Sequence, residues 1–224
     1  YWPTALWPGW WTEADPLIQG YEILPVGIWW VEGLSDANGW WSALLGGLLL
    51  DRGEAEAALM AFEQADQLGP SWVRNRVGPA QALVALGRLE EAESYLLEKI
   101  DSGATHAELW KELALVYARQ GREEAALKFM QEGVVLAKKK DEFAGYGVRD
   151  LAEVSSVDLG IRLGERLVLG GHAGPVFATN LAGLYYQVGR KVDCRRKLDQ
   201  AEVMMQRGLI DTWEFLDQRC GPGP

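Results

Sequence analysis

The chain has 224 residues, 48% hydrophobic and 24% charged, so it has enough apolar surface for a folded core and is not an intrinsically disordered protein. Its net charge of −10 argues against non-specific nucleic-acid binding, which requires Lys and Arg to neutralise phosphates. The two cysteines are too few for a disulfide framework, and with only two histidines the chain lacks the ligand spacing of a zinc or haem site.

Residues 1–38 form a Trp-rich segment that differs in composition from the rest of the chain. Eight of the eleven tryptophans lie between Trp2 and Trp41, a stretch without Lys or Arg. Three prolines, Pro3, Pro8 and Pro25, exclude one long helix. The conservative interpretation is a cap that seals the first helices. Docking against a larger, membrane-embedded partner is the alternative, and its candidate residues are Trp2, Trp7, Trp10, Trp11, Trp29 and Trp30.

Direct insertion of this segment into a lipid interface is a third interpretation, weakened by the lack of basic residues that anionic lipids attract. The longest apolar run, residues 40–50, is about half the length of a transmembrane helix, so we predict no membrane span. We also expect no signal peptide, because no basic stretch precedes an apolar one. The chain begins with Tyr1, so a processed start, or a longer protein with an upstream targeting or membrane segment, stays open.

A 34-residue period organises the chain from residue 39 onward. Turn glycines recur every 34 residues at Gly53, Gly87 and Gly121, and again at Gly189. Ser155 occupies the turn position of the repeat in between, where glycine is absent. Small side chains at fixed offsets on both sides of a turn let two antiparallel helices approach closely. Five residues after each turn position stand Ala58, Ala92, Ala126, Gly160 and Cys194, and seven residues before it stand Gly46, Ala80, Ala114, Val148 and Ala182.

Helical spacing accompanies this period. Trp110, Leu113, Ala114 and Tyr117 follow i, i+3, i+4, i+7 spacing and share one helix face. The turn glycines are expected at positive φ, and the acidic pair that follows Gly121 is expected to begin the next helix, where the helix dipole favours negative charge.

These residues resemble the tetratricopeptide repeat family, whose 34-residue unit is a helix-turn-helix. The resemblance extends over residues 39–208 and implies an all-α fold, a right-handed α-solenoid of tetratricopeptide-like helical hairpins. The predicted repeats are residues 39–72, 73–106, 107–140, 141–174 and 175–208. Residues 209–224 are predicted to be a C-terminal capping helix with Leu209, Trp213 and Leu216 facing inward, followed by a disordered tail.

Two repeats depart from the family pattern. Pro79 stands where the family usually has Leu, so we expect the first helix of the second repeat to be short or kinked. The fourth repeat contains Gly145, Gly147, Gly160 and Gly164, so we expect it to be the softest part of the array.

The family resemblance implies that the first helices of the repeats line a concave face that binds peptides or partner helices. The Lys/Asn/Arg set with which some members clamp a C-terminal carboxylate of chaperones cannot be assembled from this sequence. The residues predicted to contact a partner on the concave face are Trp40, Arg74, Gln81, Glu108, Lys111, Arg149, Thr179 and Tyr186.

No catalytic arrangement is predicted. The sequence offers neither a phosphate-binding glycine loop nor a Ser-His-Asp or Cys-His set, and His106 and His172 are interpreted as surface turn residues. Cys194 occupies a small-residue packing position and is expected to be buried and inert, whereas Cys220 is expected to lie in a flexible tail. We therefore expect no cofactor and no metal.

The sequence favours a non-catalytic protein-interaction scaffold or accessory subunit that binds one or more protein partners, a membrane-protein complex among the candidates. The alternative is the repeat-bearing C-terminal portion of a larger membrane-bound enzyme such as a transferase. A periplasmic or membrane-peripheral location is favoured over a cytoplasmic one, and the Ala-, Leu-, Gly- and Arg-rich repeats suggest a bacterial origin. The pattern makes no prediction of oligomeric state.

Overall fold

The computed structural model describes residues 39–68, 73–172, 174–204, 216, 219 and 220. The predicted Trp-rich segment at residues 1–38, most of the predicted capping helix and the tail at 221–224 lie outside these residues. The described residues contain α-helices and no β-strand, so the predicted all-α fold is confirmed. The chain divides into two units, Tyr1–Gly87 and Arg88–Pro224, called unit 1 and unit 2 below. The boundaries of the five repeats stay predictions.

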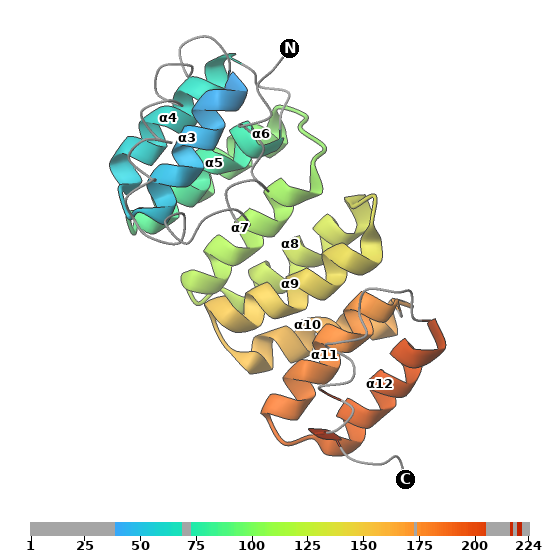
Figure 1. Cartoon of the computed structure of the whole chain (residues 1–224). Helices are drawn as coiled ribbons and strands as arrows, with labels where there is room; N and C mark the ends of the chain where they lie inside the picture. Colours follow the sequence, from blue (N-terminus) through green and yellow to red (C-terminus); the bar gives the residue numbers. More distant parts are fainter. Residues whose placement is uncertain (1–38, 69–72, 173, 205–215, 217–218, 221–224) are drawn as a thin grey trace, which may run out of the picture. The chain divides into compact units, whose positions relative to one another are not determined.

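Unit 1 contains the hairpin α3 (Gly39–Asp51) and α4 (Ala55–Leu68), with α5 (Val73–Ala85) packed against both helices (Figure 1). Phe62 fills the space between them and is 1% exposed. Gly46 and Gly78 both contact its ring, and a Cβ at Gly46 would lie 2.7 Å from ring carbons of Phe62. Glycine at these two positions therefore admits a large aromatic side chain at the centre of the unit.

Pro79 does not shorten its helix. The sequence predicted a short or kinked helix, but α5 runs for 13 residues through Pro79, as long as α3. The prediction of a shortened helix is wrong, whereas the alternative, a kink at Pro79, stays a prediction. Its basis was the lost backbone hydrogen bond, and the contacts of α5 with α3 and α4 supply the burial that offsets this loss.

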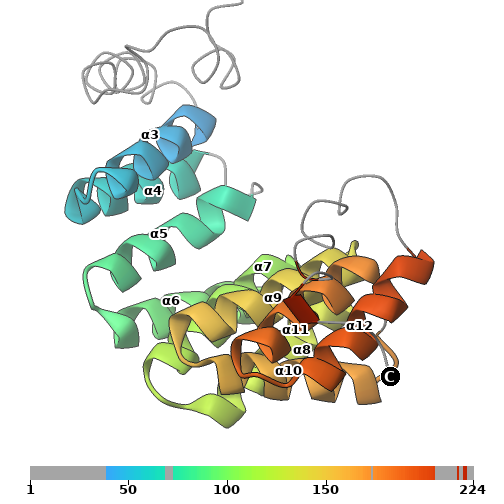
Figure 2. The same ribbon diagram turned by 60° about the horizontal axis from the view of Figure 1, so that its bottom comes forward.

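Unit 2 is a series of helices in two layers. The first helices of successive hairpins, α7, α9 and α11, lie side by side in one layer, whereas the second helices α8 and α10 contact each other in the other layer (Figures 1 and 2). The helices of this unit are α6 (Leu89–Asp101), α7 (Ala107–Arg119), α8 (Glu123–Leu136), α9 (Lys140–Val154), α10 (Val157–Leu169), α11 (Pro175–Gln187) and α12 (Lys191–Met204).

The predicted turns are confirmed at the glycines. Gly53, Gly87, Gly121 and Gly189 have φ of 77°, 74°, 73° and 76°, a left-handed conformation that glycine adopts without a Cβ clash. Helix α8 begins at Glu123, as the acidic pair after Gly121 predicted. Ser155 occupies the turn position that lacks glycine. It has φ of −128° and ends α9 without the left-handed conformation of the turn glycines.

The small residues after each turn are buried between helices. Ala58, Ala92, Ala126 and Cys194 are 0% exposed, and Gly160 is also buried. A Cβ at Gly160 would lie 2.5 Å from the carbonyl oxygen of Val148, so α9 and α10 approach each other too closely for any larger residue. Gly160 is therefore a packing residue of the fourth hairpin, as its place among the small residues after each turn predicted.

Asp141 caps the first helix of the following hairpin. Its two carboxylate oxygens accept hydrogen bonds from the backbone N–H groups of Val176 and Phe177, each at 3.0 Å. These donors belong to the first turn of α11, where backbone N–H groups lack helical partners and the dipole favours a negative charge. Asp141 thus connects the start of α9 to the start of α11.

We expect Asp141→Asn to lower the free energy of unfolding by about 1 to 2 kcal/mol, because the amide loses the charge and one of the two acceptors. Urea unfolding followed by circular dichroism measures this change. Asp158→Asn, which removes an exposed charge from the first turn of α10, is the control and should lower the unfolding midpoint less, because the lost interaction with the helix dipole is worth less than the cap. Equal midpoints for both variants would exclude the cap.

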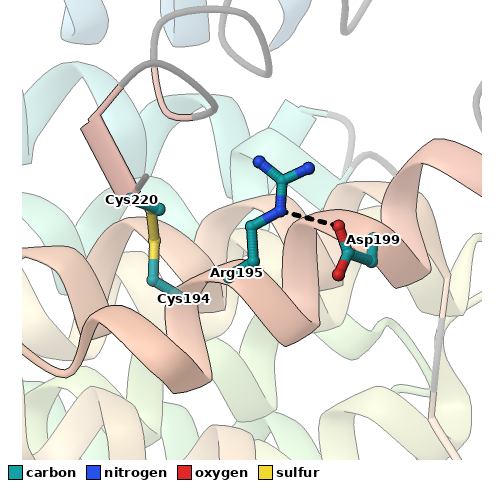
Figure 3. Close-up of a disulfide and its surroundings, with 4 residues drawn as sticks. All are labelled: Cys194, Arg195, Asp199 and Cys220. Atoms are coloured by element: carbon teal, nitrogen blue, oxygen red, sulfur yellow. Dashed lines mark hydrogen bonds and ion pairs between the residues drawn. A yellow bond between two sulfur atoms is a disulfide. The ribbon is translucent and has the colours of Figure 1, made fainter. Parts of the chain in front are cut away.

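The two cysteines form a disulfide bond (Figure 3). Cys194 lies on α12 and is 0% exposed, as predicted, but Cys220 is only 4% exposed and is bonded to it, with a Cα–Cα distance of 5.9 Å. The expectation that Cys220 lies in a flexible tail is therefore wrong. The sequence could not show that the chain returns to α12 after 26 residues.

Candidate functional site

One stripe of residues repeats on the three first helices of unit 2. Its members range from exposed, as at Tyr146 and Arg149, to buried, as at Leu115, which is 8% exposed. Its members are spaced i, i+4, i+7, i+11 along each helix, and equivalent members recur once in every repeat. Since α9 contacts both α7 and α11, the three stripes lie next to one another, and we call them together the first-helix face. The face comprises Glu108, Glu112, Leu115 and Arg119 on α7, Glu142, Tyr146, Arg149 and Glu153 on α9, and Val176, Asn180, Gly183 and Gln187 on α11.

The centre of this face is an aromatic and cationic cluster on α9. Tyr146 is 43% exposed, and the guanidinium carbon of Arg149 lies 5.0 Å from its ring centroid. Arg149 also pairs with Asp150 at 3.0 Å and with Glu153 at 3.6 Å. Asp150 forms a second ion pair with Lys111 of α7 at 3.2 Å. We call Lys111, Tyr146, Arg149 and Asp150 the α9 cluster.

Asp150 fixes the geometry of the cluster. Its side chain is only 15% exposed, and it holds one cation from its own helix and one from α7. A partly buried carboxylate between two cations orients both of them, so less conformational entropy is lost when a ligand binds. The side chains of Tyr146 and Arg149 remain open to solvent for contact with another molecule.

The predicted contact residues of unit 1 occupy varied environments. Trp40 on α3 is 39% exposed, and its ring makes an edge contact with Trp41 at 4.5 Å between centroids. Gln81 on α5 is half-buried. The side chain of Arg74, and those of the six N-terminal tryptophans, lie outside the described residues, so their predicted roles stay predictions.

In unit 2 some of the predicted contact residues lie on the first-helix face, whereas others are buried where neighbouring helices pack together. Glu108 and Arg149 belong to the first-helix face, and Lys111 reaches it through Asp150. Thr179, in contrast, is 2% exposed and donates its hydroxyl hydrogen bond to the carbonyl oxygen of Pro175. Tyr186 is half-buried. The structure therefore brings Lys111 and Arg149 together and leaves Thr179 without an exposed surface.

Sequence reasoning missed Tyr146 and Asp150. The position that it expected on the concave face, occupied by Thr179 in the last repeat, lies at a seam between helices. The more open position comes one residue later, at Tyr146 after buried Gly145 and at Asn180 after Thr179. An exposed tyrosine three residues before an arginine on one helix was the signal that could have identified the α9 cluster.

A second type of cluster connects successive repeats. Arg122 stacks on the ring of Tyr117 at 4.2 Å and pairs with Glu93 of α6 at 2.8 Å. The corresponding set in the last repeat is Arg190, which stacks on Tyr185 at 4.4 Å and pairs with Glu165 of α10 at 2.9 Å. In both sets the glutamate comes from the preceding hairpin. These clusters stabilise the stacking of repeats.

The Tyr185 cluster is expected to make the folded chain less stable at alkaline pH. Burial, the charge of Glu165 and the hydrogen bond to Glu165 raise the pKa of Tyr185 from 10.0 to about 12. The neutral phenol is therefore favoured by folding. Its contribution is complete below pH 10, the unfolded value, and is lost as pH rises through about 12.

We expect the chain to lose stability between pH 10 and 12, and Tyr185→Phe to lose less over this window because its side chain cannot ionise. Urea unfolding midpoints at several pH values measure the effect. Tyr146→Phe, at an exposed tyrosine, is the control and should retain the full pH dependence of the wild-type chain. An unchanged slope for Tyr185→Phe would contradict the assignment.

The described part of the chain contains neither a cluster of metal-ligating side chains nor a helix that could span a membrane. No group of three His, Cys, Asp or Glu side chains in this part is arranged to hold a metal ion. Every described helix is too short or too polar to cross a membrane.

Comparisons with known proteins identify the fold. No protein-family model matches the sequence, and no curated protein matches it. A chain of the crystal structure of the APC/C hetero-tetramer Cut9-Hcn1 superposes with a TM-score of 0.50 at 13% identity, over 80% of this chain. The superposition spans 36% of that chain, so this protein covers about a third of its length.

Two smaller solved structures are also similar. Pseudomonas aeruginosa pilF has 17% identity and a TM-score of 0.48, over 85% of this chain and 84% of its own. A tetratricopeptide repeat protein from Parabacteroides merdae has 16% identity and a TM-score of 0.48, over 88% of this chain and 82% of its own. At these identities the similarity concerns the fold alone.

Proposed function

We propose that this chain, which has the fold of the tetratricopeptide repeat solenoids, is a non-catalytic scaffold or accessory subunit that binds protein partners through the first-helix face of unit 2. The α9 cluster carries the proposal. It combines an exposed tyrosine with an arginine stacked on its ring, on a face that three helices build together. Tyrosine and arginine are among the residue types that most often dominate protein interfaces.

The electrostatics of the cluster favour a peptide or helix with both acidic and apolar side chains. Arg149 can give up its pairing with Glu153, whose side chain is 68% exposed, in exchange for a carboxylate of the partner. The ring of Tyr146 offers apolar contact beside that carboxylate. Lys111 offsets the charge of the partly buried Asp150, so the positive charge of Arg149 remains available to the partner.

Affinity capture from cells of the source organism tests the proposal. The intact chain is compared with Tyr146→Ala/Arg149→Ala, and proteins that copurify are quantified by mass spectrometry. We expect the double variant to bind its principal partner at least about tenfold more weakly, as for the loss of interface hot spots. Circular dichroism verifies that both chains are folded to the same extent.

The matched control is Lys128→Ala/Val135→Ala on α8, where the two truncated side chains are 69% and 66% exposed. This variant removes a cation and an apolar group from a second helix and should retain full binding. Equal capture by the intact chain and by both variants would contradict the proposed binding face.

We also propose that the partner includes a membrane-associated complex. The support for this extension is the N-terminal accumulation of tryptophans, a residue typical of interfaces and of membrane-water boundaries. Capture from detergent-solubilised membranes, with the full chain and with a variant carrying Ala at Trp10, Trp11, Trp29 and Trp30, tests it. The variant should recover much less of the complex, and undiminished recovery would contradict the extension.

A further inference from the structure

The chain places one of its own side chains, Leu216, against the first-helix face. Gly183 of α11 occupies the position on the first-helix face that Arg149 occupies on α9, one repeat earlier. A Cβ at Gly183 would have Leu216 Cδ1 as its nearest neighbour, at 4.0 Å. Leu216 is only 6% exposed, so it is buried against the protein although it comes after the last repeat. A position that is exposed on α9 is therefore partly covered on α11 by a side chain of the same molecule.

The Cys194–Cys220 disulfide joins the chain segment that follows Leu216 to α12. Cys220 follows Leu216 by four residues, and its partner Cys194 lies on α12, the helix paired with α11 in the last hairpin (Figure 3). The bond shortens the path by which Leu216 is tethered to this hairpin. The chain contains no other cysteine, so no alternative intramolecular pairing competes with it.

We propose that Leu216, tethered by the Cys194–Cys220 bond, occupies the α11 part of the partner-binding face, and that reduction of the bond opens this part to the partner. The face itself is that of the proposed function, on which this inference rests. Gly183 without a side chain leaves room for an apolar group, which Leu216 supplies in the oxidised chain. A partner with an apolar side chain can take the same place after reduction.

The redox step requires a dithiol reductant. Its thiolate attacks the disulfide, and Cys220, 4% exposed against 0% for Cys194, is the more accessible sulfur. The S–S bond breaks, both cysteines become thiols with two electrons and two protons from the reductant, and the reductant leaves as a disulfide. The bond is stable in an oxidising compartment and is opened in a reducing one.

Hydroxyl-radical footprinting of the full chain, oxidised and after treatment with dithiothreitol, tests the inference without a partner. We expect the labelling of Leu216 to rise several-fold on reduction. Leu127, which is 0% exposed, should stay protected, and Tyr146 should stay labelled to the same extent in both states. Because no partner is used, a negative result here is independent of the capture experiments.

Cys194→Ala should reproduce the reduced pattern under oxidising conditions. Alanine stands at this place in the first three repeats, in Ala58, Ala92 and Ala126, so hairpin packing is preserved. Cys220→Ser is a second variant that leaves α12 unchanged. Continued protection of Leu216 after reduction and in both variants would overturn the proposal. Loss of protection at Leu127 together with Leu216 would also overturn it, because the bond would then hold the fold rather than the contact.

Discussion

Replacement of Ala126 by tryptophan is expected to lower the free energy of unfolding by about 3 kcal/mol, because the indole has no space between α7 and α8. Ala126 is 0% exposed, at the place where the small residues of the repeat allow the two helices to approach. Leu127 and Met130, also 0% exposed, flank this residue on α8 and cannot yield toward solvent. The urea midpoint measured by circular dichroism should fall accordingly.

Val135→Trp is the matched control for this prediction. It places the same indole on the same helix, but at a side chain that is 66% exposed, so no helix contact is disturbed. We expect its midpoint to remain within experimental error of the wild-type value. If Ala126→Trp unfolds at the same urea concentration as Val135→Trp, the 34-residue phase assigned to the third repeat is wrong.

The phase of the repeat could be predicted because one physical requirement recurs at fixed spacing. Each hairpin needs a residue that tolerates positive φ at its turn and small residues where its helices approach. Gly121 and Ala126 satisfy both requirements in the third repeat, and the structure confirms them. Local sequence suffices for these features because the two helices of a hairpin are neighbours in the chain.

The candidate site was predicted less completely, for geometric reasons. Family resemblance identified the first helices, but positions one residue apart on a helix differ by about 100° in direction. That difference separates buried Thr179 from half-buried Asn180. The expectation therefore included Thr179, which lies in a seam, and omitted Tyr146, which is exposed.

Contacts between distant residues could not be predicted at all. Asp141 is separated from Val176 by 35 residues, and nothing local indicates that its carboxylate caps α11. The disulfide is similar, since two cysteines 26 residues apart give no sign of a shared location. These interactions depend on how one repeat stacks on another, and single-repeat patterns do not contain that information.

The second large prediction concerns the fourth hairpin. In this hairpin the larger of the two facing residues lies on the first helix and the smaller on the second. The other hairpins have Gly or Ala in the first helix opposite the small residue of the second. The fourth has the larger Val148 in α9, and glycine, Gly160, in α10. The Cβ missing from Gly160 would lie 2.5 Å from the Val148 carbonyl oxygen and 2.8 Å from Leu184 Cδ1.

We expect Gly160→Ala to lower the free energy of unfolding by about 2 kcal/mol, because a backbone oxygen cannot move aside without shifting α9. Alanine gains about 1 kcal/mol over glycine in a helix, and this gain is smaller than the cost of the clash. A urea titration at constant protein concentration gives the change in midpoint. The result distinguishes a packing glycine from a merely flexible one, for which alanine would stabilise the helix.

Gly183→Ala is the same substitution with the opposite expected sign. Its new Cβ would meet only Leu216 Cδ1, at the ordinary contact distance of 4.0 Å, so the helix gain of up to about 1 kcal/mol should appear undiminished. The two variants should therefore unfold on opposite sides of the wild-type midpoint. Stabilisation by both would show that α9 and α10 are not in close contact at Gly160, and the interpretation of the fourth hairpin as tightly packed would fail.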